Sequence, residues 1–507
     1  MVKLRKILIA NRGEIAVRLM RTCREMNIAT VAIYSEADRA SLHVRTADQA
    51  YCVGPAPSRE SYLAIDRILE VAKKSRADAI HPGYGFLSEN PAFVRACERA
   101  GIVFIGPPAL AMDAMGEKTR ARTQMIRAGV AVVPGSSEPV RSLEQAREFA
   151  HKIGYPVMLK AAGGGGGKGM RKVDKAEDLG SAWQGAKSES LSAFGNDAVY
   201  LEKYLEKPHH VEIQVFADTH ANCIHLNERE CSVQRRHQKV IEETPSPIVS
   251  AALREAMGRV AVRAAKAVGY VGAGTVEFLL DVHRNFYFLE MNTRLQVEHP
   301  VTEWVLGQDL VAWQIKVAQG ERLPIVRTLF PRGHAIEARI YAEDPARNFL
   351  PSPGTIQYLS APSGPWIRDD SGVYAGYPVS TFYDPMISKL SAWAPTRAEA
   401  IQRLHRALGE YVVKGITTNI QFLQAVLEHP QFVSGDYDTG FLTRENAKLT
   451  ERRNPDLEQV AVIAAAVYAQ QRGLERSRNL ADRKTDQRAS AWRWGGRFAR
   501  RRTRLGQ

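Results

Sequence analysis

Five polar residues with chemically useful side chains recur at every second position of one short stretch. They are Glu290, Asn292, Arg294, Gln296 and Glu298, and mostly apolar residues stand between them. Period-two alternation is typical of a β-strand and places such a set on one side of it. An ordinary exposed strand face would also be polar, so a chemical interpretation needs a second observation.

That observation is a strand-like run just upstream, which a polar break at residues 283–285 separates from the first stretch. Folding the two runs as a hairpin about this break places Glu277 opposite Glu290, and Asp281 opposite Phe286. Cross-strand neighbours lie about 5 Å apart, a distance at which like charges repel. The pairing therefore predicts that something positive lies between Glu277 and Glu290.

A divalent cation with oxygen ligands satisfies this requirement. Mg²⁺ typically takes one or two carboxylates and leaves its other positions to water and phosphates. Asn292, two residues beyond Glu290 on the same face, adds a neutral oxygen to the predicted set. A solvated hairpin edge is the alternative.

The length of the polar stretch limits how it can work. If residues 290–298 stayed extended at about 3.3 Å per residue, their ends would lie roughly 26 Å apart, too far for one site. Either Arg294 and Glu298 serve something else, or the chain curls back after Thr293. We favour the curl, with Arg294 holding an anion and Glu298 acting as a base beside the metal.

A second motif is a run of five glycines at residues 163–167, which follows a strand-like segment ending at Lys160 and precedes Lys168. Consecutive glycines suit a loop whose backbone N–H groups wrap a phosphate chain, or a lid that moves. Gly169 stands where a Walker A loop needs Ser or Thr, so this is not such a loop. The run predicts phosphate contact, and a plain flexible linker is the alternative.

The elements that must position these motifs begin with a regular alternation of strands and helices. Apolar runs at residues 6–10, 30–34, 79–80 and 103–105 are separated by helical patterns, which predicts a doubly wound parallel sheet. No Gly-x-Gly-x-x-Gly follows the first strand, so a dinucleotide site is disfavoured. Arg18 and the turn at residues 81–86 either line a site or simply pack.

Later segments supply further charged groups. Residues 227–239 are rich in charged and polar side chains, among them Glu228, Arg229, Glu230, Gln234, Arg235, Arg236, His237 and Lys239, and form either a solvated loop or an anion platform between two strands. A strand over residues 333–341 places Glu337 and Arg339 on one face. We expect an N-terminal domain at 1–115, a nucleotide-binding region at 116–320 with a lid at about 132–204, a C-terminal α/β subdomain at 321–447 and a basic helical tail at 448–507.

Composition excludes several classes of protein. The 507 residues carry a net charge of +14, but eleven Lys or Arg against two Asp in residues 476–507 account for +9 of it. The excess charge therefore describes the tail and does not predict a nucleic-acid-binding body. No apolar run has the length of a membrane helix, and five scattered cysteines argue against a disulfide framework. We expect a cytoplasmic protein.

Six ordered motifs closely resemble those of biotin carboxylase, an enzyme with the ATP-grasp fold. The motifs are Asn11-Arg12-Gly13-Glu14-Ile15-Ala16, His81-Pro82-Gly83-Tyr84-Gly85-Phe86, the glycine run with Met170, Glu202-Lys203-Tyr204, Gln234-Arg235-Arg236-His237-Gln238-Lys239 and Glu290 to Pro300. The resemblance covers residues 3–447. It implies a parallel-sheet domain followed by an ATP-grasp fold with a mobile lid and a mixed α/β subdomain.

The resemblance also implies a reaction and the residues that perform it. ATP phosphorylates bicarbonate to carboxyphosphate, and the carboxyl group passes to N1 of biotin on a carrier protein. The implied ATP-binding residues are Lys118, Lys160, Gly166, Gly167, Glu202, Lys203, Tyr204, Leu205, His210, Gln234, His237, Glu277 and Glu290. The implied Mg²⁺ (or Mn²⁺) ligands are Glu277, Glu290 and Asn292. Lys239, Arg294, Gln296 and Val297 would hold bicarbonate, with Glu298 as its base.

On the biotin side, the resemblance implies that Arg339 stabilises the developing enolate, with Tyr84 and Arg18 in support. Since no Ala-Met-Lys-Met attachment motif occurs, we expect the biotin carrier to be a separate chain. A carboxyltransferase subunit and a homodimer are the other expected partners, and the holoenzyme would act on acetyl-CoA or another acyl-CoA.

The tail extends beyond the resemblance. Asn454 and Pro455 predict the start of an apolar helix, and aromatic and basic residues follow it. These types are enriched at interfaces, so we expect residues 448–507 to dock onto a carboxyltransferase or carrier partner. The alternatives for the whole chain are another ATP-grasp ligase, a non-catalytic nucleotide-binding scaffold subunit and a nucleic-acid-binding protein.

Overall fold

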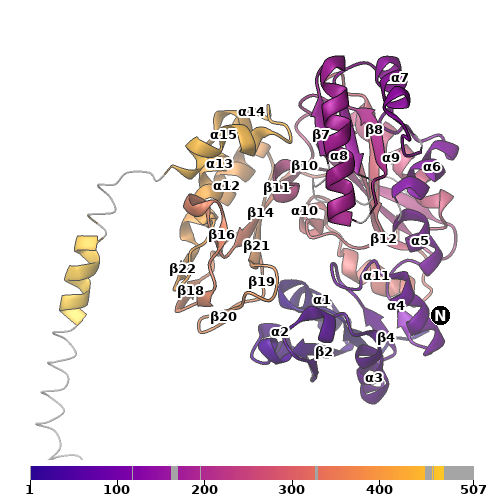
Figure 1. Ribbon diagram of the computed structural model, residues 1–507. Coiled ribbons are helices and arrows are strands. Elements are labelled where there is room, and N and C mark those ends of the chain that lie inside the picture. The colour runs from indigo at the N-terminus through magenta and orange to yellow at the C-terminus, as the bar shows by residue number, and fades with distance from the viewer. Residues whose placement is uncertain are drawn as a thin grey trace, which may run out of the picture. The chain divides into compact units, whose positions relative to one another are not determined.

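The computed structural model describes residues 2–116, 118–136, 138–161, 170–194, 196–325, 329–451, 460 and 462–472. The chain consists of two compact units, Met1–Leu449 and Thr450–Gln507, and Figure 1 labels elements of the first. Within the described ranges, no helix has the length and apolar character needed to cross a membrane.

The N-terminal domain is a five-stranded parallel sheet, as predicted. Its strand order is β3 (Gln49–Gly54), β2 (Ala29–Ser35), β1 (Lys6–Ile9), β4 (Ala79–His81) and β5 (Val103–Phe104). The helices are α1 (Gly13–Glu25), α2 (Leu42–Thr46), α3 (Ile65–Ser75), α4 (Pro91–Arg99) and α5 (Ala109–Gly116). Ile7 and Ile9 share a core with α1, whereas Leu8 shares one with α3 and α4. Helices thus cover both faces, because successive strand residues point in opposite directions.

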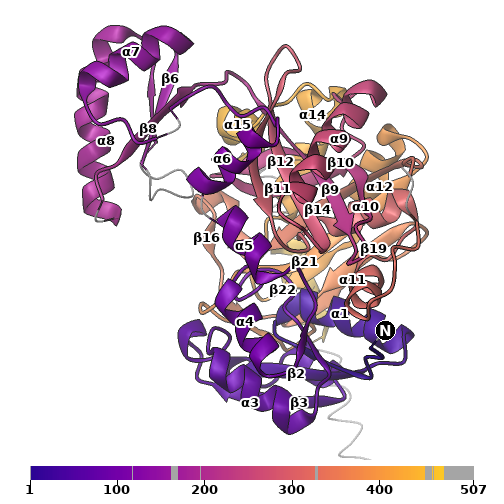
Figure 2. The ribbon, with the colours of Figure 1, turned by 90° about the vertical axis from the view of Figure 1, so that its right-hand side faces the viewer.

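The largest element is an eight-stranded antiparallel sheet. Its order is β13 (Phe286–Asn292), β12 (Gly272–Leu280), β9 (His209–Ala217), β10 (Cys223–Arg235), β11 (Gln238–Thr244), β14 (His334–Tyr341), β21 (Met386–Ala394) and β19 (Ile367–Ser371). The strands come from both the predicted nucleotide-binding region and the C-terminal subdomain, so one sheet joins the two (Figure 2).

The two faces of this sheet differ in chemistry. On one face, Val211 and Ile213 pack with α9 (Ala251–Ala267), and Ile336 and Ala338 pack with α12 (Arg397–Glu410). The alternate residues therefore point to the other face, which carries α10 (His299–Leu306) packed on Ala335. That second face holds the charged residues of the candidate site.

A small separate sheet has the order β7 (Met170–Val173), β6 (Val157–Ala161) and β8 (Val199–Lys203). It has its own core with α7 (Leu143–Ile153) and α8 (Leu179–Phe194), and α6 (Lys118–Arg127) precedes it. Ser142 caps α7 through the backbone N–H of Gln145. The glycine run at 163–167, predicted to contact phosphate, lies outside the described residues.

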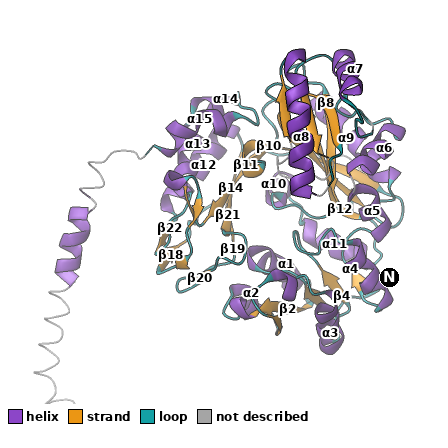
Figure 3. Ribbon diagram, viewed as in Figure 1, coloured by secondary structure: helices purple, strands orange, loops and turns teal. Residues whose placement is uncertain are grey.

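The C-terminal part of the first unit is helical with short strand pairs (Figure 3). The strand pairs are β15 (Glu343–Asp344) with β16 (Leu350–Pro351), β17 (Gly354–Thr355) with β20 (Pro378–Val379), and β18 (Tyr358–Ser360) with β22 (Val412–Lys414). The remaining helices are α11 (Leu310–Ala318), α13 (Ile420–Glu428), α14 (Pro430–Ser434) and α15 (Phe441–Thr450).

In the second unit, residues 462–472 are helical, and their apolar side chains are exposed: Val462 by 69% and Ile463 by 63%. The predicted cap at Asn454 and Pro455 lies outside the described residues.

The curl that we favoured for residues 290–298 is confirmed, because β13 ends at Asn292 and the chain then turns. The predicted register of the hairpin was wrong at one end. A β-bulge after Glu277 shifts the hairpin register, so that Leu280, not Asp281, lies opposite Phe286. Asp281 instead accepts hydrogen bonds from the backbone of the hairpin turn.

Of the two interpretations of residues 227–239, the solvated loop is excluded. This segment is the β10–β11 hairpin, and Glu228, Arg229 and Glu230 are buried within it. Their polar groups can be buried because each has partners in the interior, such as the two hydrogen bonds from Arg254 to Glu228.

Candidate functional site

Three neighbouring strands of the large sheet place carboxylates in a row on the face that carries α10, which we call the charged face. Glu277 of β12 lies directly opposite Glu290 of β13, which confirms the predicted pairing, and opposite Glu212 of β9. Opposed residues of antiparallel strands share a face. The structure therefore extends the predicted pair of carboxylates to three.

Lys239 of β11 lies at the centre of the site. Its Nζ donates to Glu212 at 2.5 Å, Glu277 at 2.9 Å, Glu298 at 2.7 Å and Gln296 at 3.3 Å. These contacts show that the chain does curl back after Thr293, as predicted, since Glu298 and Glu277 share one ammonium. One lysine thus links the predicted metal carboxylate to the predicted base.

The second cation on Glu298 is Arg339 of β14. Its guanidinium donates to Glu298 at 2.9 Å and to Glu242 of β11 at 2.6 Å. Glu298, at the start of α10, is 1% exposed. The carboxylate is therefore held in one place by two cations, and water has little access to it.

This environment keeps Glu298 ionised. Burial alone would raise its pKa, but Lys239 and Arg339 outweigh burial and hold the pKa of Glu298 well below its ordinary value. The same balance, with Lys239 and His210 as the cations, lowers the pKa of Glu277. For Glu242, burial outweighs Arg339, and the pKa is raised. Glu298 is thus available as a proton acceptor, whereas Glu242 favours its protonated form.

A fully buried arginine supports this arrangement and was not predicted. Arg229 of β10 donates to Glu212 at 2.5 Å, Gln214 at 2.7 Å, Thr302 at 3.0 Å and Gln296 at 3.4 Å. Its charge offsets that of Glu212, which then accepts a second cation, Lys239. The alternation of His210, Glu212 and Gln214 was a usable signal for Glu212, whereas Arg229 stood in a run that resembled a solvated loop.

One cluster of side chains could hold a metal ion, and it includes Glu277 but not Glu290 of the predicted ligands. Oxygen atoms of Glu212 and Glu277 lie with His210 within one ligand-sized cluster, in which all candidate atoms are within 4.8 Å of one another. His210 Nε2 lies 2.9 Å from Glu277. Asn292 turns its Nδ2 toward Glu277 and its Oδ1 toward Arg294. These two contacts fix the orientation of the amide, because a carboxylate only accepts hydrogen bonds and a guanidinium only donates them.

The predicted anion holder, Arg294, has partners on both sides. Its Nε donates to Glu89 at 2.8 Å and its Nη2 to Asn292 at 2.9 Å. Glu89 also accepts from the backbone N–H of Thr293 at 2.9 Å, so it fixes the point where the chain turns. Glu89 was missed because it lies 205 residues before Arg294.

The predicted ATP-binding residues fall on two sheets. On β6 and β8, Lys160 donates to Glu202 at 2.5 Å, and Lys203 donates to the carbonyls of Gly154 and Tyr155. Tyr204 and Leu205 follow β8. Gln234 lies near the end of β10, and the exposed His237 lies in the β10–β11 turn. Gly166 and Gly167 and the side chain of Lys118 lie outside the described residues.

Of the predicted biotin-side residues, Tyr84 stands at the carboxyl end of β4, where its backbone carbonyl accepts from Asn11 at 2.8 Å. The Tyr84 hydroxyl is buried and has no hydrogen-bond partner among the described residues. Arg18 instead forms ion pairs with Glu303 and Asp309, each at 2.9 Å. Arg18 also lines a surface pocket with these two carboxylates, and its supporting role stays a prediction.

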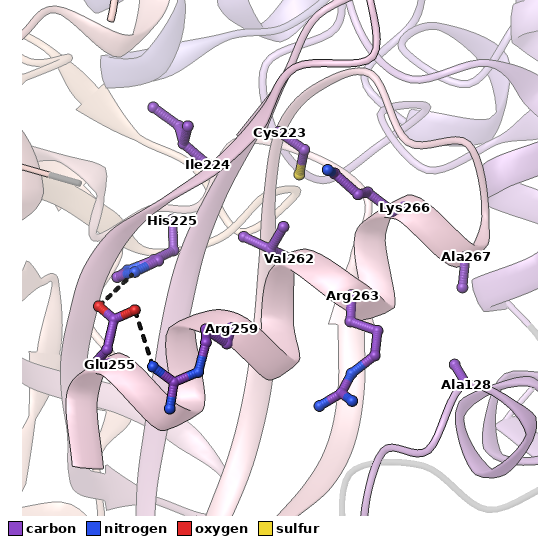
Figure 4. Close-up of a pocket in the computed structure, with 10 residues that line it drawn as sticks. All are labelled: Ala128, Cys223, Ile224, His225, Glu255, Arg259, Val262, Arg263, Lys266 and Ala267. Carbon is purple, nitrogen blue, oxygen red and sulfur yellow. Dashed lines mark hydrogen bonds and ion pairs between the residues drawn. The ribbon is translucent and has the colours of Figure 1, made fainter. Parts of the chain in front are cut away.

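A surface groove of about 910 Å³ lies elsewhere, between α9, the start of β10 and Ala128. Figure 4 shows Arg259, Arg263 and Lys266 along it, with Glu255 contacting both His225 and Arg259. It contains none of the predicted site residues.

Comparison with known proteins identifies the family of the chain. Three family models match in succession: the biotin carboxylase N-terminal domain at residues 3–112, the ATP-binding domain of the carbamoyl-phosphate synthase L chain at 117–326 and the biotin carboxylase C-terminal domain at 337–444. A biotin carboxylase of Halalkalibacterium halodurans is 55% identical over 89% of this chain and all of its own length.

Other relatives are longer or have known structures. The mouse mitochondrial methylcrotonoyl-CoA carboxylase subunit alpha is 52% identical, and the match covers 88% of this chain but 62% of that subunit. The biotin carboxylase of Campylobacter jejuni, solved as a β,γ-ATP complex, superposes with a TM-score of 0.83 at 49% identity, covering 87% and 99% of the two chains.

A further solved relative is the biotin carboxylase domain dimer of the Hydrogenobacter thermophilus 2-oxoglutarate carboxylase, with MgADP, ADP and bicarbonate bound. It is 44% identical with a TM-score of 0.83, covering 90% of this chain and all of that domain. The charged face, the three successive domain matches and these relatives lead to one assignment: the chain belongs to the biotin carboxylase family, enzymes of the ATP-dependent ligase class with an ATP-grasp fold.

Proposed function

We propose that the chain carboxylates biotin with bicarbonate at the expense of MgATP, through carboxyphosphate. The observation that carries the proposal is Glu298, a buried carboxylate kept ionised by Lys239 at 2.7 Å and Arg339 at 2.9 Å. A base beside two fixed cations suits the deprotonation of an anion, because the cations hold the substrate while the base removes its proton.

In the first step, Lys239, Arg294, Gln296 and Val297 would hold bicarbonate next to Glu298. Lys239 and Gln296 are already in contact at 3.3 Å, so the anion would join an existing network and replace contacts between its members. Removal of the bicarbonate proton by Glu298 gives an oxygen nucleophile. This oxygen attacks the γ-phosphorus of ATP, so that ADP leaves and carboxyphosphate forms. The network supplies position and charge, which are what phosphoryl transfer needs from a protein.

Mg²⁺ or Mn²⁺, held by Glu277, Glu290 and Asn292, would neutralise phosphate charge when bound. The nucleotide would contact Lys118, Lys160, Gly166, Gly167, Glu202, Lys203, Tyr204, Leu205, His210, Gln234 and His237. Closure of a lid at residues 132–204 would exclude water from the labile mixed anhydride.

In the second step, Arg339 would stabilise the enolate-like form of the biotin ureido group, with Tyr84 beside it. Arg339 and the bicarbonate-binding Lys239 both contact the carboxylate of Glu298. Biotin, which accepts the carboxyl group, would therefore bind next to the place where carboxyphosphate forms. Biotin is here a substrate carried by another protein.

The same proposal covers partners and organisation. We propose a separate biotin carboxyl carrier protein, a carboxyltransferase subunit for acetyl-CoA or another acyl-CoA, a homodimer and a cytoplasmic location. In support, several relatives are named as subunits, and all five cysteines are unpaired. The domain limits 1–115, 116–320, 321–447 and 448–507 belong to this proposal.

The tail at 448–507 is proposed as a docking arm for these partners. The exposed apolar side chains of residues 462–468 and the basic residues beyond them support it. A chain ending at residue 447 should carboxylate free biotin but lose its partners in a pull-down. Equal recovery of the carboxyltransferase by both chains would contradict the docking role.

The proposed activity is tested by ATP hydrolysis with Mg²⁺, with and without bicarbonate and free biotin. Hydrolysis should depend on bicarbonate and rise with biotin. Folded, Mg²⁺-supplied protein that hydrolyses no ATP would favour a scaffold subunit, and hydrolysis driven by another carboxylate or amine would favour a different ATP-grasp ligase.

A further inference from the structure

A lysine outside the proposed reaction is buried behind the site. Lys389 lies on β21, is 1% exposed and stands between Arg339 of β14 and Asp370 of β19 in the sheet register. Lysine is almost never fully buried unless it is paired. Its contacts should therefore show what it does.

The strongest of these contacts is to the loop that carries the proposed base. Nζ of Lys389 donates to the carbonyl oxygen of Val297 at 2.6 Å. The same ammonium lies 3.7 Å from Glu14 at the start of α1 and 5.7 Å from the centre of the Tyr84 ring. Lys389 thus connects the N-terminal domain, the β13–α10 loop and the C-terminal part of the large sheet.

The geometry of the peptide bond gives this contact a consequence. The carbonyl of Val297 and the N–H of Glu298 belong to one planar peptide group. A donor that fixes the carbonyl therefore also restricts the direction in which the Glu298 side chain projects from the loop. The carboxylate end of Glu298 is held independently by Lys239 and Arg339. Both ends of this side chain are therefore constrained, the backbone end by Lys389.

We propose that Lys389 is a positioning residue, which orients the Val297–Glu298 peptide so that bicarbonate meets the base in a fixed geometry. This inference rests on the proposed function. Lys389 would not touch the substrate, and its positive charge would also favour an anion bound on the other side of the peptide. Glu14, whose pKa burial raises to about 7, completes the buried cluster.

The test is a set of variants assayed for bicarbonate-dependent ATP hydrolysis and for carboxybiotin formation. Lys389→Met should raise the KM for bicarbonate about 10- to 100-fold, the loss typical of one charge-assisted hydrogen bond, and leave the KM for ATP within about twofold. Fewer carboxybiotin molecules should form per ATP hydrolysed, because a misplaced base no longer couples the two steps.

Two further variants separate positioning from folding. Lys389→Met/Glu14→Gln also removes the acidic partner, so it keeps the interior free of an unpaired charge if the single variant does not fold. Ser388→Ala is the matched control: its hydroxyl lies on the same strand but donates to Asp369, and it should not change the KM for bicarbonate.

Crystal structures of the wild type and the Lys389 variants give a readout that is independent of activity. A displaced Val297 carbonyl with a raised bicarbonate KM is the expected result. An unmoved loop with an unchanged bicarbonate KM would overturn the positioning role and leave the proposed function intact. A displaced loop in a protein whose wild type shows no bicarbonate-dependent hydrolysis would support positioning and overturn the proposed function.

Discussion

The two sheets that carry the proposed active-site residues hold their charges in different ways. On the small sheet, Lys160 and Glu202 form a pair whose side chains are 31% and 16% exposed. On the large sheet, Lys239 and Glu298 are 11% and 2% exposed, and each contacts more than one opposite charge. The first pair can exchange partners with water, whereas the second is built into the interior.

This difference suggests a division of labour. A buried charge network is costly to rearrange, so it suits the step in which a base must meet a small anion in a fixed geometry. A partly exposed ion pair contributes little to the free energy of unfolding, so its two side chains can separate and contact a nucleotide instead. The predictions below test whether the two sheets differ in this way.

The largest effect is expected at Arg229. Arg229→Met removes one of the two buried cations that contact Glu212 and should lower the free energy of unfolding by about 3–5 kcal/mol. The matched control is Arg259→Met, since Arg259 is 66% exposed in its pair with Glu255 and should contribute less than about 1 kcal/mol. Urea unfolding of both variants measures this, and equal losses would remove the contrast between buried and exposed pairs.

The next effect is a pH dependence on the opposite face of the large sheet, where α12 packs. Glu243 accepts from Arg397 at 2.7 and 2.8 Å and from His334 at 2.6 Å. Although burial opposes ionisation, these partners lower the pKa of Glu243 from 4.5 to about 2. A depressed carboxylate pKa stabilises the fold above the unfolded-state pKa, and this stability is lost as the pH falls toward 2.

The advantage of the wild type over Glu243→Gln should therefore shrink by up to about 3 kcal/mol as the pH falls from 6 toward 2. The measurement is the free energy of unfolding of both proteins across this range. A difference that stays constant down to pH 3 would mean that Glu243 is not held ionised by its partners.

A smaller effect is expected at the proposed metal site. Glu290→Gln removes one of the facing carboxylates and should raise the Mg²⁺ concentration for half-maximal activity about tenfold, or about 1.4 kcal/mol. Asp281→Asn, at the turn of the same hairpin, is the control and should leave the Mg²⁺ requirement unchanged. An unchanged requirement in Glu290→Gln would place the metal elsewhere.

The smallest stability effect is expected on the small sheet. Lys160→Met should change the free energy of unfolding by less than about 1 kcal/mol, because its pair with Glu202 is partly exposed, while it raises the KM for ATP. Lys172→Met, on the neighbouring β7, should change neither quantity appreciably. A loss of several kcal/mol in Lys160→Met would show that this sheet is as dependent on its charges as the large one.

The sequence allowed the parallel N-terminal sheet and the Glu277–Glu290 pairing to be predicted, because both depend on periodicity and on nearby turns. The β-bulge after Glu277 was missed, since an inserted residue leaves no mark in a period-two count. The burial of Arg229 was missed for a related reason. A run rich in both charge signs resembles a solvated loop until tertiary partners are known.

Contacts between distant segments were beyond any local pattern. Glu89 meets Arg294 across 205 residues, and Lys389 meets Val297 across 92. Glu242 lies on the same strand as Lys239, but only its contact with Arg339 of β14 distinguishes it from an ordinary polar strand residue. The roles of these residues could be recognised only once the tertiary structure had brought distant segments of the chain together.

The central claim is that Glu298, held by Lys239 and Arg339, is the base for bicarbonate. Fixation of labelled bicarbonate on free biotin by the wild type and Glu298→Gln, with ATP binding measured in parallel, tests it most directly. The account predicts at least a 100-fold loss of fixation, the scale of a general base, with ATP affinity retained. Fixation near the wild-type rate in Glu298→Gln would contradict it.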